Sequence, residues 1–240
     1  MGHASDGRAA AKATGIIGAM QSEIAAIREA MDAVQVTVVA GMEFAAGTID
    51  GTEVVVAQCG MGKVNAGICA QTLISGFGVG CVINTGVAGS LSDELTINDF
   101  VVSTDAVQHD FDVSPIGFAR GEIPYTGLFA FPADEELRRQ AVAAVRQAAP
   151  ASMVLEGRVC SGDQFIATKE QTEAITSTFG GLCAEMEGAA IAQVCHLNQV
   201  PYVIIRAISD DSDDMTFEQF QAEAARECAG AVLAMVSARS

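Results

Sequence analysis

Apolar residues in this chain gather in short continuous runs that alternate with segments of helical periodicity. Such runs, bounded by glycine or polar residues, are typical of strands buried on both faces of a sheet. They predict strands at residues 14–19, 37–39, 44–49, 53–58, 80–84, 100–103, 158–162, 182–185 and 201–208. Helices are expected after residue 20, with Ile24, Ile27 and Met31 on one face, and at 64–75, 134–148, 169–178, 187–197 and 216–238. This alternation predicts one α/β layer structure without an internal linker.

Two connections between these elements carry signals of their own. Asp50-Gly51 is a strong two-residue hairpin signal. Residues 108–132 form a long segment with little regular pattern. A loop of this length within a compact domain is usually functional or covered by a partner. Because its apolar residues would be a liability if exposed, we expect a second copy of the chain to cover them: Phe111, Ile116, Phe118, Ile123 and Tyr125.

The charge of the chain limits its partners. Its 240 residues carry a net charge of −17, from 13 basic and 30 acidic residues. A surface this acidic repels nucleic acid and anionic membranes, so neither is an expected partner. Residues 64–92 contain no charged residue, but Asn65, Gln71 and Asn84 interrupt them. That stretch fits a helix followed by a buried strand better than a membrane span.

The cysteines and the N-terminus indicate a reduced, cytoplasmic setting. Seven cysteines occur, an odd number, with no C-x-x-C spacing, and most lie within apolar runs. They are therefore expected as small core residues rather than as a disulfide framework. Residues 1–13 lack the apolar core of a signal peptide. We interpret them as a mobile extension or an artificial remnant ahead of a single domain at residues 14–240.

Three acidic residues, Glu23, Glu187 and Asp210, each follow an expected strand. In open α/β sheets, ligands bind outside the carboxyl ends of strands. Three carboxyl groups meeting there supply the acid, base and cation-stabilising groups for cleaving a glycosidic bond through an oxocarbenium ion. Glu23 and Glu187 also suit a structural role, because the helix macrodipole favours glutamate in a first turn. Arg206, within the strand before Asp210, needs an anionic partner if it is buried.

Other motifs offer weaker chemistry. The glycine turn at 60–62 lacks the third glycine of a dinucleotide fingerprint, and no Ser or Thr follows Lys63 as in a P-loop. A plain strand–helix turn is therefore favoured. The acidic stretches at 109–112 and 210–214 lack the spacing of a zinc or calcium site. No G-x-S-x-G occurs, so serine hydrolase chemistry has no support, and no metal or cofactor is expected.

Six segments, in order, resemble motifs of the 5′-methylthioadenosine/S-adenosylhomocysteine nucleosidase family. They are GIIGAMQSE at 15–23, CGMGKVNA at 59–66, INTGVAG at 83–89, SGDQFI at 161–166, AEMEGAAIA at 184–192 and RAISD at 206–210. The likeness extends over residues 14–238. It implies the purine nucleoside phosphorylase-like fold, a three-layer α/β/α domain with a central mixed twisted sheet. It also implies a nucleoside substrate, no cofactor and a homodimer.

The resemblance assigns a role to each acid. Asp210 would protonate adenine N7 as general acid, which a raised pKa in an apolar pocket favours. Glu23 would orient and deprotonate the attacking water, with Arg206 and Glu185 nearby, and Glu187 would bind the ribose hydroxyls.

The resemblance also implies contacts with each part of the nucleoside. Phe165 would stack on adenine, the backbone of Ile166 would read its edge, and Met186 would pack under the ribose. Met61, Ile116 and Pro124 would line the apolar 5′-thio pocket, the last two from the partner subunit. Further substrate-binding positions are Ala19, Val87, Val113 and Ser209. Val87 departs from the family pattern, since many members carry serine there, near the attacking water.

Three other functions are compatible with parts of this pattern. A phosphorylase of the same fold needs Arg or Ser donors where this chain has Asn84 and Val87, neither of which suits phosphate. A nucleosidase that cleaves adenine from aminodeoxyfutalosine is not distinguished by the sequence. A catalytically inactive binding protein is disfavoured because all three acids are present.

Overall fold

The computed structural model describes residues 12–210 and 214–239, with the backbone alone for residue 210 and residues 214–219. Residues 1–11 of the expected N-terminal extension, and Asp211 to Asp213 of the acidic stretch, lie outside the described residues. Within the described ranges, no helix is long and apolar enough to cross a membrane.

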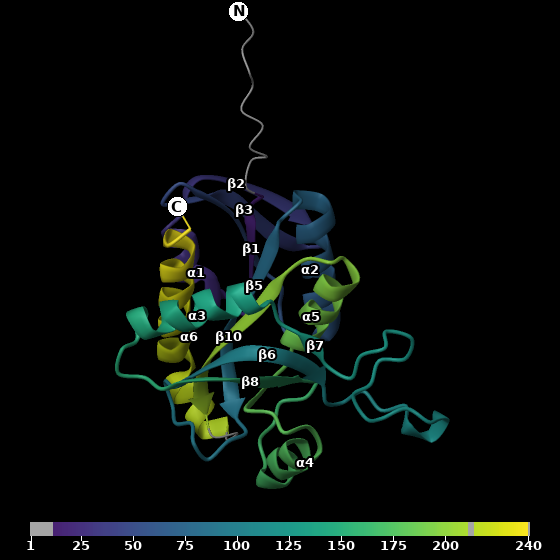
Figure 1. The fold of residues 1–240 in the computed structure, drawn as a ribbon. Coiled ribbons are helices and arrows are strands. Elements are labelled where there is room, and N and C mark those ends of the chain that lie inside the picture. The colour runs from purple at the N-terminus through teal and green to yellow at the C-terminus, as the bar shows by residue number, and fades with distance from the viewer. Residues whose placement is uncertain (1–11, 211–213, 240) are drawn as a thin grey trace, which may run out of the picture.

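Strands and helices alternate along the chain as expected (Figure 1). The strands are β1 (Thr14–Gly18), β2 (Asp32–Val39), β3 (Met42–Ile49), β4 (Thr52–Gln58), β5 (Cys81–Ser90), β6 (Phe100–Gln108), β7 (Phe131–Pro132), β8 (Val154–Ser161), β9 (Cys183–Glu185) and β10 (Tyr202–Asp210). The helices are α1 (Gln21–Glu29), α2 (Lys63–Phe77), α3 (Glu135–Ala148), α4 (Lys169–Phe179), α5 (Gly188–Leu197) and α6 (Asp214–Ser237), with a 3₁₀ turn η1 (Ser114–Ile116).

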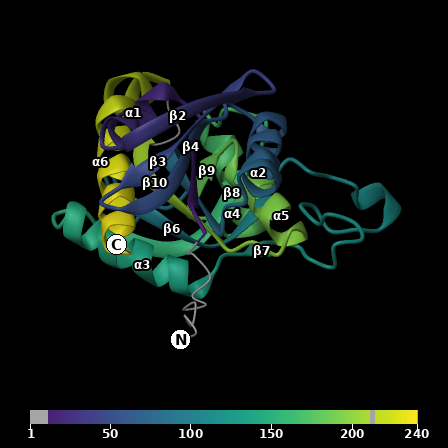
Figure 2. The ribbon, with the colours of Figure 1, turned by 90° about the horizontal axis from the view of Figure 1, so that it is seen from above.

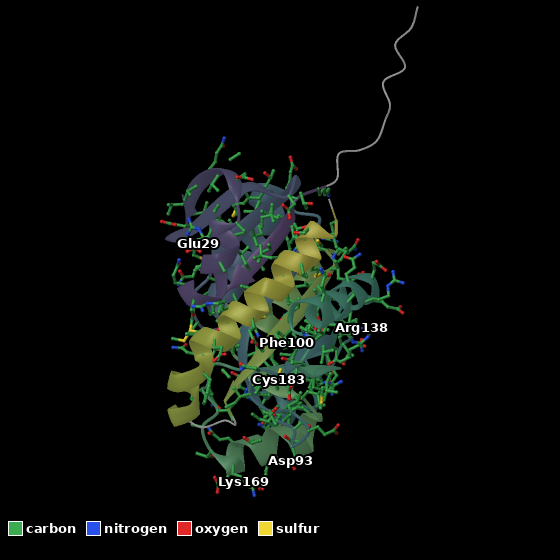
Figure 3. The ribbon with its side chains drawn as sticks, turned by 90° about the vertical axis from the view of Figure 1, so that its left-hand side faces the viewer. Glu29, Asp93, Phe100, Arg138, Lys169 and Cys183 are labelled. Carbon is green, nitrogen blue, oxygen red and sulfur yellow. The ribbon has the colours of Figure 1, made fainter. Side chains whose placement is uncertain are left out.

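Helices cover both faces of one mixed sheet and so make the expected three layers. Helices α1, α3 and α6 pack on one face, where Figure 3 shows α6 running along the sheet beside α3. Helices α2 and α5 pack on the other face, as the view from above shows (Figure 2). A hydrophobic core fills the space between the sheet and each helix layer. Helix α4 buries Ile175 and Phe179 in a smaller cluster at one end.

The topology brings several strand ends to one place. Strand β5 pairs in parallel with β1 on one side and with β10 on the other. Strand β10 pairs with β6, β6 with β8, β8 with β9, and β9 returns to β5. These five strands therefore close on themselves, while β4, β3 and β2 continue as an open sheet beyond β1. The carboxyl ends of β1, β8 and β10 consequently lie around the second half of β5, the region expected to bind ligand.

Several strands are longer than the apolar runs predict. Strand β5 continues from Asn84 to Ser90, because pairing with β9 and β10 holds residues of mixed polarity in extended form. Strand β6 likewise continues past Ser103 to Gln108 through its pairing with β8. Strand β2 begins at Asp32 rather than at residue 37 and lies at the exposed sheet edge, so it lacks a continuous apolar run. Continuous apolar runs mark buried strands made of apolar residues, whereas the extensions of β5 and β6 contain glycine or polar residues and β2 is exposed.

The middle part of residues 108–132 projects from the body of the molecule beyond α5, and both ribbon views agree on this (Figures 1 and 2). Only η1 and the short β7 give the segment regular structure. Tyr125 is 99% exposed and Ile116 is 72% exposed. The segment is therefore irregular, as its sequence predicts, and it carries apolar side chains into solvent.

Candidate active site

Glu23 enters the sheet region from the first turn of α1. Its Oε2 accepts hydrogen bonds from the backbone N–H groups of Ala19 (2.6 Å) and Met20 (2.9 Å). Its Oε1 accepts from the N–H of Val87 on β5 at 3.0 Å. The side chain is 2% exposed. The same carboxyl group thus stabilises the start of α1, as the helix macrodipole favours, and connects the end of β1 to Val87 within β5.

Glycines let the backbone approach this carboxylate closely. A Cβ at Gly18 would overlap Ile24 and press on Glu23. A Cβ at Gly86 would overlap both the carboxylate of Glu23 and the guanidinium of Arg206. Glu23 and Arg206 therefore face each other across the same point of β5, and glycine at 86 leaves the space for both.

Arg206 is fully buried at 1% exposure, and its required anionic partner is Glu185 at the end of β9. The guanidinium Nη2 donates to Glu185 Oε2 and, at 2.7 Å, to Oδ1 of Asn84 on β5. The hydroxyl of Ser161 on β8 also donates to Glu185. Four strands therefore contribute to one buried ion pair, as the cost of burying a charge demands.

Glu187 lies two residues after Glu185 and is the N-cap residue of α5. Its Oε1 accepts from the N–H of Gly62 at 2.8 Å, and its Oε2 lies 3.9 Å from Arg206 Nη2. Glu185 in turn accepts from the N–H of Glu187 at 3.0 Å and from that of Gly188 at 2.8 Å. Glu185 therefore fixes both the cation and the helix start from which Glu187 extends.

Burial and charge set the protonation of this cluster. Burial raises the pKa of Glu23 above its ordinary value, against the attraction of Arg206 and three backbone donors. Burial raises the pKa of Glu187 to about 8, helped by repulsion from Glu185 and opposed by Arg206 and the N–H of Gly62. Burial disfavours the charge of Arg206, yet its pKa is raised by the three glutamates. At neutral pH the arginine is therefore charged and Glu187 holds a proton.

An open cavity lies beside the cluster, with about 580 Å³ of empty space when the solvent at its mouth is included. Nine of the expected site residues line it: Ala19, Glu23, Met61, Val87, Phe165, Ile166, Glu185, Met186 and Glu187. The lining is mainly apolar with carboxylates at one side, an arrangement typical of small-molecule sites. Met61 is 63% exposed and Phe165 is 44% exposed, so the cavity opens to the surface at these two residues.

The other expected site residues lie elsewhere. Arg206 is held behind Glu185, and Ser209 is buried near the end of β10. Val113, Ile116 and Pro124 are on the projecting segment and do not line the cavity of this chain. The backbone of Asp210 pairs with Gly89, which does line the cavity, but its side chain is outside the described residues.

The sequence interpretation missed residues that hold the cluster or line the cavity. Asn84 and Ser161 support Arg206 and Glu185, although both lie within segments already noted as motifs. The remaining lining residues are Met20, Ala88, Gly89, Gln164 and Ala184. Position within a motif was the available signal, but a motif does not say which side chain it faces. Among the described residues, no group of three or more His, Cys, Asp or Glu side chains is placed to hold a metal ion.

Comparisons with known proteins agree with this geometry. The sequence profile of the phosphorylase superfamily matches residues 13–237. A 5′-methylthioadenosine/S-adenosylhomocysteine nucleosidase from Geobacillus kaustophilus (strain HTA426) is 43% identical over 230 residues, which cover 92% of this chain and 95% of the relative.

Two solved structures are similar over nearly the whole chain. One is a nucleosidase of the same description from Neisseria meningitidis, in complex with methylthio-immucillin-A. It has a TM-score of 0.91 and 37% identity, covering 95% of this chain and 99% of the other. The second is the futalosine hydrolase of Helicobacter pylori strain 26695. It has a TM-score of 0.89 and 35% identity, covering 95% of this chain and 98% of the other.

The raised pKa of Glu187 predicts a pH-dependent stability. The folded pKa is about 8 against an ordinary 4.5, so the folded chain holds a proton that the unfolded chain has lost between these values. The free energy of unfolding therefore falls as pH rises through this range. Urea titrations at about pH 5 and about pH 9 should show a smaller fall for Glu187→Gln than for wild type.

The matched control is Glu53→Gln, an exposed glutamate on β4, which should keep the wild-type fall. The pKa of Glu23 is also raised, so Glu23 contributes to the fall in the same direction, and it is present in wild type and in Glu187→Gln alike. Equal falls for wild type and Glu187→Gln would contradict the raised pKa.

Proposed function

This chain belongs to the 5′-methylthioadenosine/S-adenosylhomocysteine nucleosidases of the phosphorylase superfamily, and we propose that it hydrolyses the N-glycosidic bond of both nucleosides. The products would be adenine and the corresponding 5-thioribose. The observation that carries the proposal is the buried cluster of Glu23, Glu185 and Glu187 around Arg206, beside a mainly apolar cavity. Its excess of carboxyl groups over cations suits a reaction that develops positive charge on the sugar.

Glu23 would activate the attacking water. Three backbone N–H groups fix the orientation of its carboxylate, so the side chain can hold a water molecule in one direction. Burial raises its pKa, which brings its basicity closer to that of an effective general base near neutral pH. Arg206 lies across Gly86 from this side chain, and its charge lowers the pKa of Glu23 against the larger effect of burial.

Asp210 would protonate adenine at N7 and accept from its N6 amino group. Its backbone is at the end of β10, beside Gly89 of the cavity wall. A purine anion is a poor leaving group, and a proton at N7 makes the base leave as a neutral molecule. Phe165 and the backbone of Ile166, in the same wall, would hold the adenine ring.

Glu187 would bind the ribose hydroxyls above Met186. Both residues line the cavity, and the N–H of Gly62 orients the carboxyl group of Glu187. The oxygen atoms of this carboxyl group would accept hydrogen bonds from the ribose, and their negative partial charge would stabilise the positive charge that develops on the sugar. Met61 would contact the 5′-thio group at the open side of the cavity.

The same geometry favours water over phosphate as the nucleophile. Arg206 is already paired with Glu185, and Asn84 is engaged by Arg206 and by the carbonyl of Ile17. Glu23 and Glu185 would repel a phosphate dianion. We therefore propose a hydrolase rather than a phosphorylase. The similarity to a futalosine hydrolase makes aminodeoxyfutalosine the alternative substrate, and an adenine-release assay with that nucleoside in place of 5′-methylthioadenosine tests it.

A homodimer would complete the site. The exposed apolar residues of the projecting segment lie on the same side of the molecule as α2, whose Val64 and Ile68 are 73% and 41% exposed (Figures 1 and 2). Covering this surface with a second copy would remove it from water. The copy would supply Ile116 and Pro124 to the 5′-thio pocket, with Val113 beside them.

The first test of the function is adenine release from 5′-methylthioadenosine in phosphate-free buffer with EDTA. Adenine and 5-methylthioribose should form at a rate unchanged by added phosphate, because water is the nucleophile. Chromatography of the products measures this directly. A sugar 1-phosphate among the products, or a requirement for phosphate, would contradict hydrolysis.

The second test concerns the acids. Glu23→Gln and Asp210→Asn should each lower kcat by about 10²–10⁴, because each removes a proton transfer. Glu29→Gln, at the exposed end of the same helix as Glu23 (Figure 3), is the matched control and should keep full activity. Retention of more than about a tenth of wild-type kcat, a loss under about 1.4 kcal/mol, by Glu23→Gln or Asp210→Asn would refute that residue's role.

The third test concerns the dimer. Ile116→Asp should weaken self-association and raise KM for 5′-methylthioadenosine together, because one residue serves both the interface and the pocket. Light scattering and steady-state kinetics measure the two effects. Val38→Asp, at an apolar position on β2 that is 63% exposed, should change neither. A wild-type monomer with full activity would rule out the dimer proposal.

A further inference from the structure

A closed ring of polar contacts lies just outside the cavity. Lys63 Nζ is 2.6 Å from Asp110 Oδ1. Asp110 Oδ2 accepts from the N–H of Asp163 at 2.8 Å. Asp163 Oδ1 accepts from the N–H of Lys63 at 2.8 Å. The three residues come from three separate segments, and none of them lines the cavity.

On one side the ring is joined to Glu187, the residue proposed to bind the ribose. The residue before Lys63 is Gly62, whose N–H donates to Glu187 at 2.8 Å. Consecutive N–H groups of the turn are thus held by Glu187 and by Asp163. Gly62 has φ of +95°, and a Cβ there would lie 3.1 Å from Asp163 Oδ1. The position of the Glu187 carboxyl group is therefore tied to where Asp163 holds the turn.

On the other side the ring is joined to the base-binding wall. Asp163 directly precedes the stretch Gln164–Ile166 that lines the cavity. Its own N–H is anchored by Asp110, and the preceding N–H, of Gly162, donates to the carbonyl of Glu185 at 3.1 Å. Gly162 packs directly on His109, where a Cβ would overlap the imidazole. The start of this wall is therefore fixed by residues 109 and 110.

The ion pair between Lys63 and Asp110, one of the three contacts of the ring, is substantially buried. The side chains of Lys63 and Asp110 are each 16% exposed. Burial disfavours the charge of Asp110, yet its pKa is lowered, because Lys63 and the N–H of Asp163 stabilise the carboxylate. Lys63 also donates to Gln108 at 3.1 Å, and Gln108 donates to Gln193 on α5 at 2.7 Å. Two acceptors on Lys63 and two donors to Asp110 fix both side chains.

We propose that Lys63 and Asp110 are positioning residues. They hold the carboxyl group of Glu187, which would bind the ribose, at a fixed distance and orientation from the base-binding wall Gln164–Ile166. The inference rests on the proposed function. The bond to be broken joins the two halves of the nucleoside, so reaction requires both halves to be held at the correct separation. Small errors of placement at a reacting bond cost large factors in rate. Adenine alone would contact only the base-binding wall, so its binding does not depend on the distance between that wall and Glu187.

The test uses Lys63→Met, Asp110→Asn and the double variant, with Lys63→Arg as the conservative change. Lys169→Met is the matched control, a lysine on α4 whose side chain is 84% exposed at one end of the molecule (Figure 3). For each protein, kcat and KM for 5′-methylthioadenosine, the inhibition constant of adenine and the melting temperature are measured. Rates are expressed per active site, so that a loss of folded enzyme does not count as a loss of rate.

Each single variant should lose about 10- to 100-fold in kcat/KM, chiefly through kcat, while adenine inhibition changes by less than about threefold. The double variant should be no slower than the slower single variant, because the pair acts as a unit. Lys63→Arg should recover most of the rate, since it keeps a cation facing Asp110. A purely structural role would lower the melting temperature and leave kcat and KM per active site unchanged.

Three results would overturn the inference. They are losses that multiply in the double variant, adenine inhibition that weakens as much as kcat/KM falls, and kinetics of Lys63→Met equal to those of Lys169→Met. Failure of the proposed function looks different. A wild-type protein that releases no adenine would reject that function, and this inference with it, before any variant is compared.

Discussion

The buried ion pair between Arg206 and Glu185 is the constraint on which the site depends. A guanidinium 1% exposed inside a sheet is tolerated only when its charge is met by an anion and further hydrogen bonds. Asn84 accepts a hydrogen bond from the guanidinium and Ser161 donates one to Glu185, each from a different strand. The pair can form only when β5, β8, β9 and β10 are in register, and these four strands with β6 make the closed part of the sheet.

This pair also sets the chemistry of its neighbours. Arg206 offsets one carboxylate through direct contact and attracts two others from a greater distance. The cluster therefore keeps an excess of acidic groups in a place that burial makes costly for charge. One consequence is a proton held by Glu187, and another is a raised pKa for Glu23. A site of this kind is electrostatically prepared for a substrate that becomes positive as it reacts.

Much of the fold follows from local pattern. Runs buried on both faces identified β1, β4 and the first half of β5, and helical periodicity identified α3 and α6. The pattern was weaker where a strand is defined by its neighbours. Strand β2 is exposed along its whole length, and the second half of β5 contains glycines and polar residues. Such segments are extended because partner strands bond to them, and no local run of apolar residues records that pairing.

The sequence by itself predicted which charged residues to examine, since Glu23 and Glu187 stand in short motifs that follow strands and Arg206 stands within a buried strand. The tertiary structure alone decided their partners. It paired Arg206 with Glu185 rather than Glu23, joined Gly62 to Glu187 across 125 positions, and closed the ring of Lys63, Asp110 and Asp163. It also left Val113, Ile116 and Pro124 outside the lining of the cavity of their own chain. The reason is physical: a motif limits where a side chain starts, whereas its contacts depend on segments that only the packed sheet brings together.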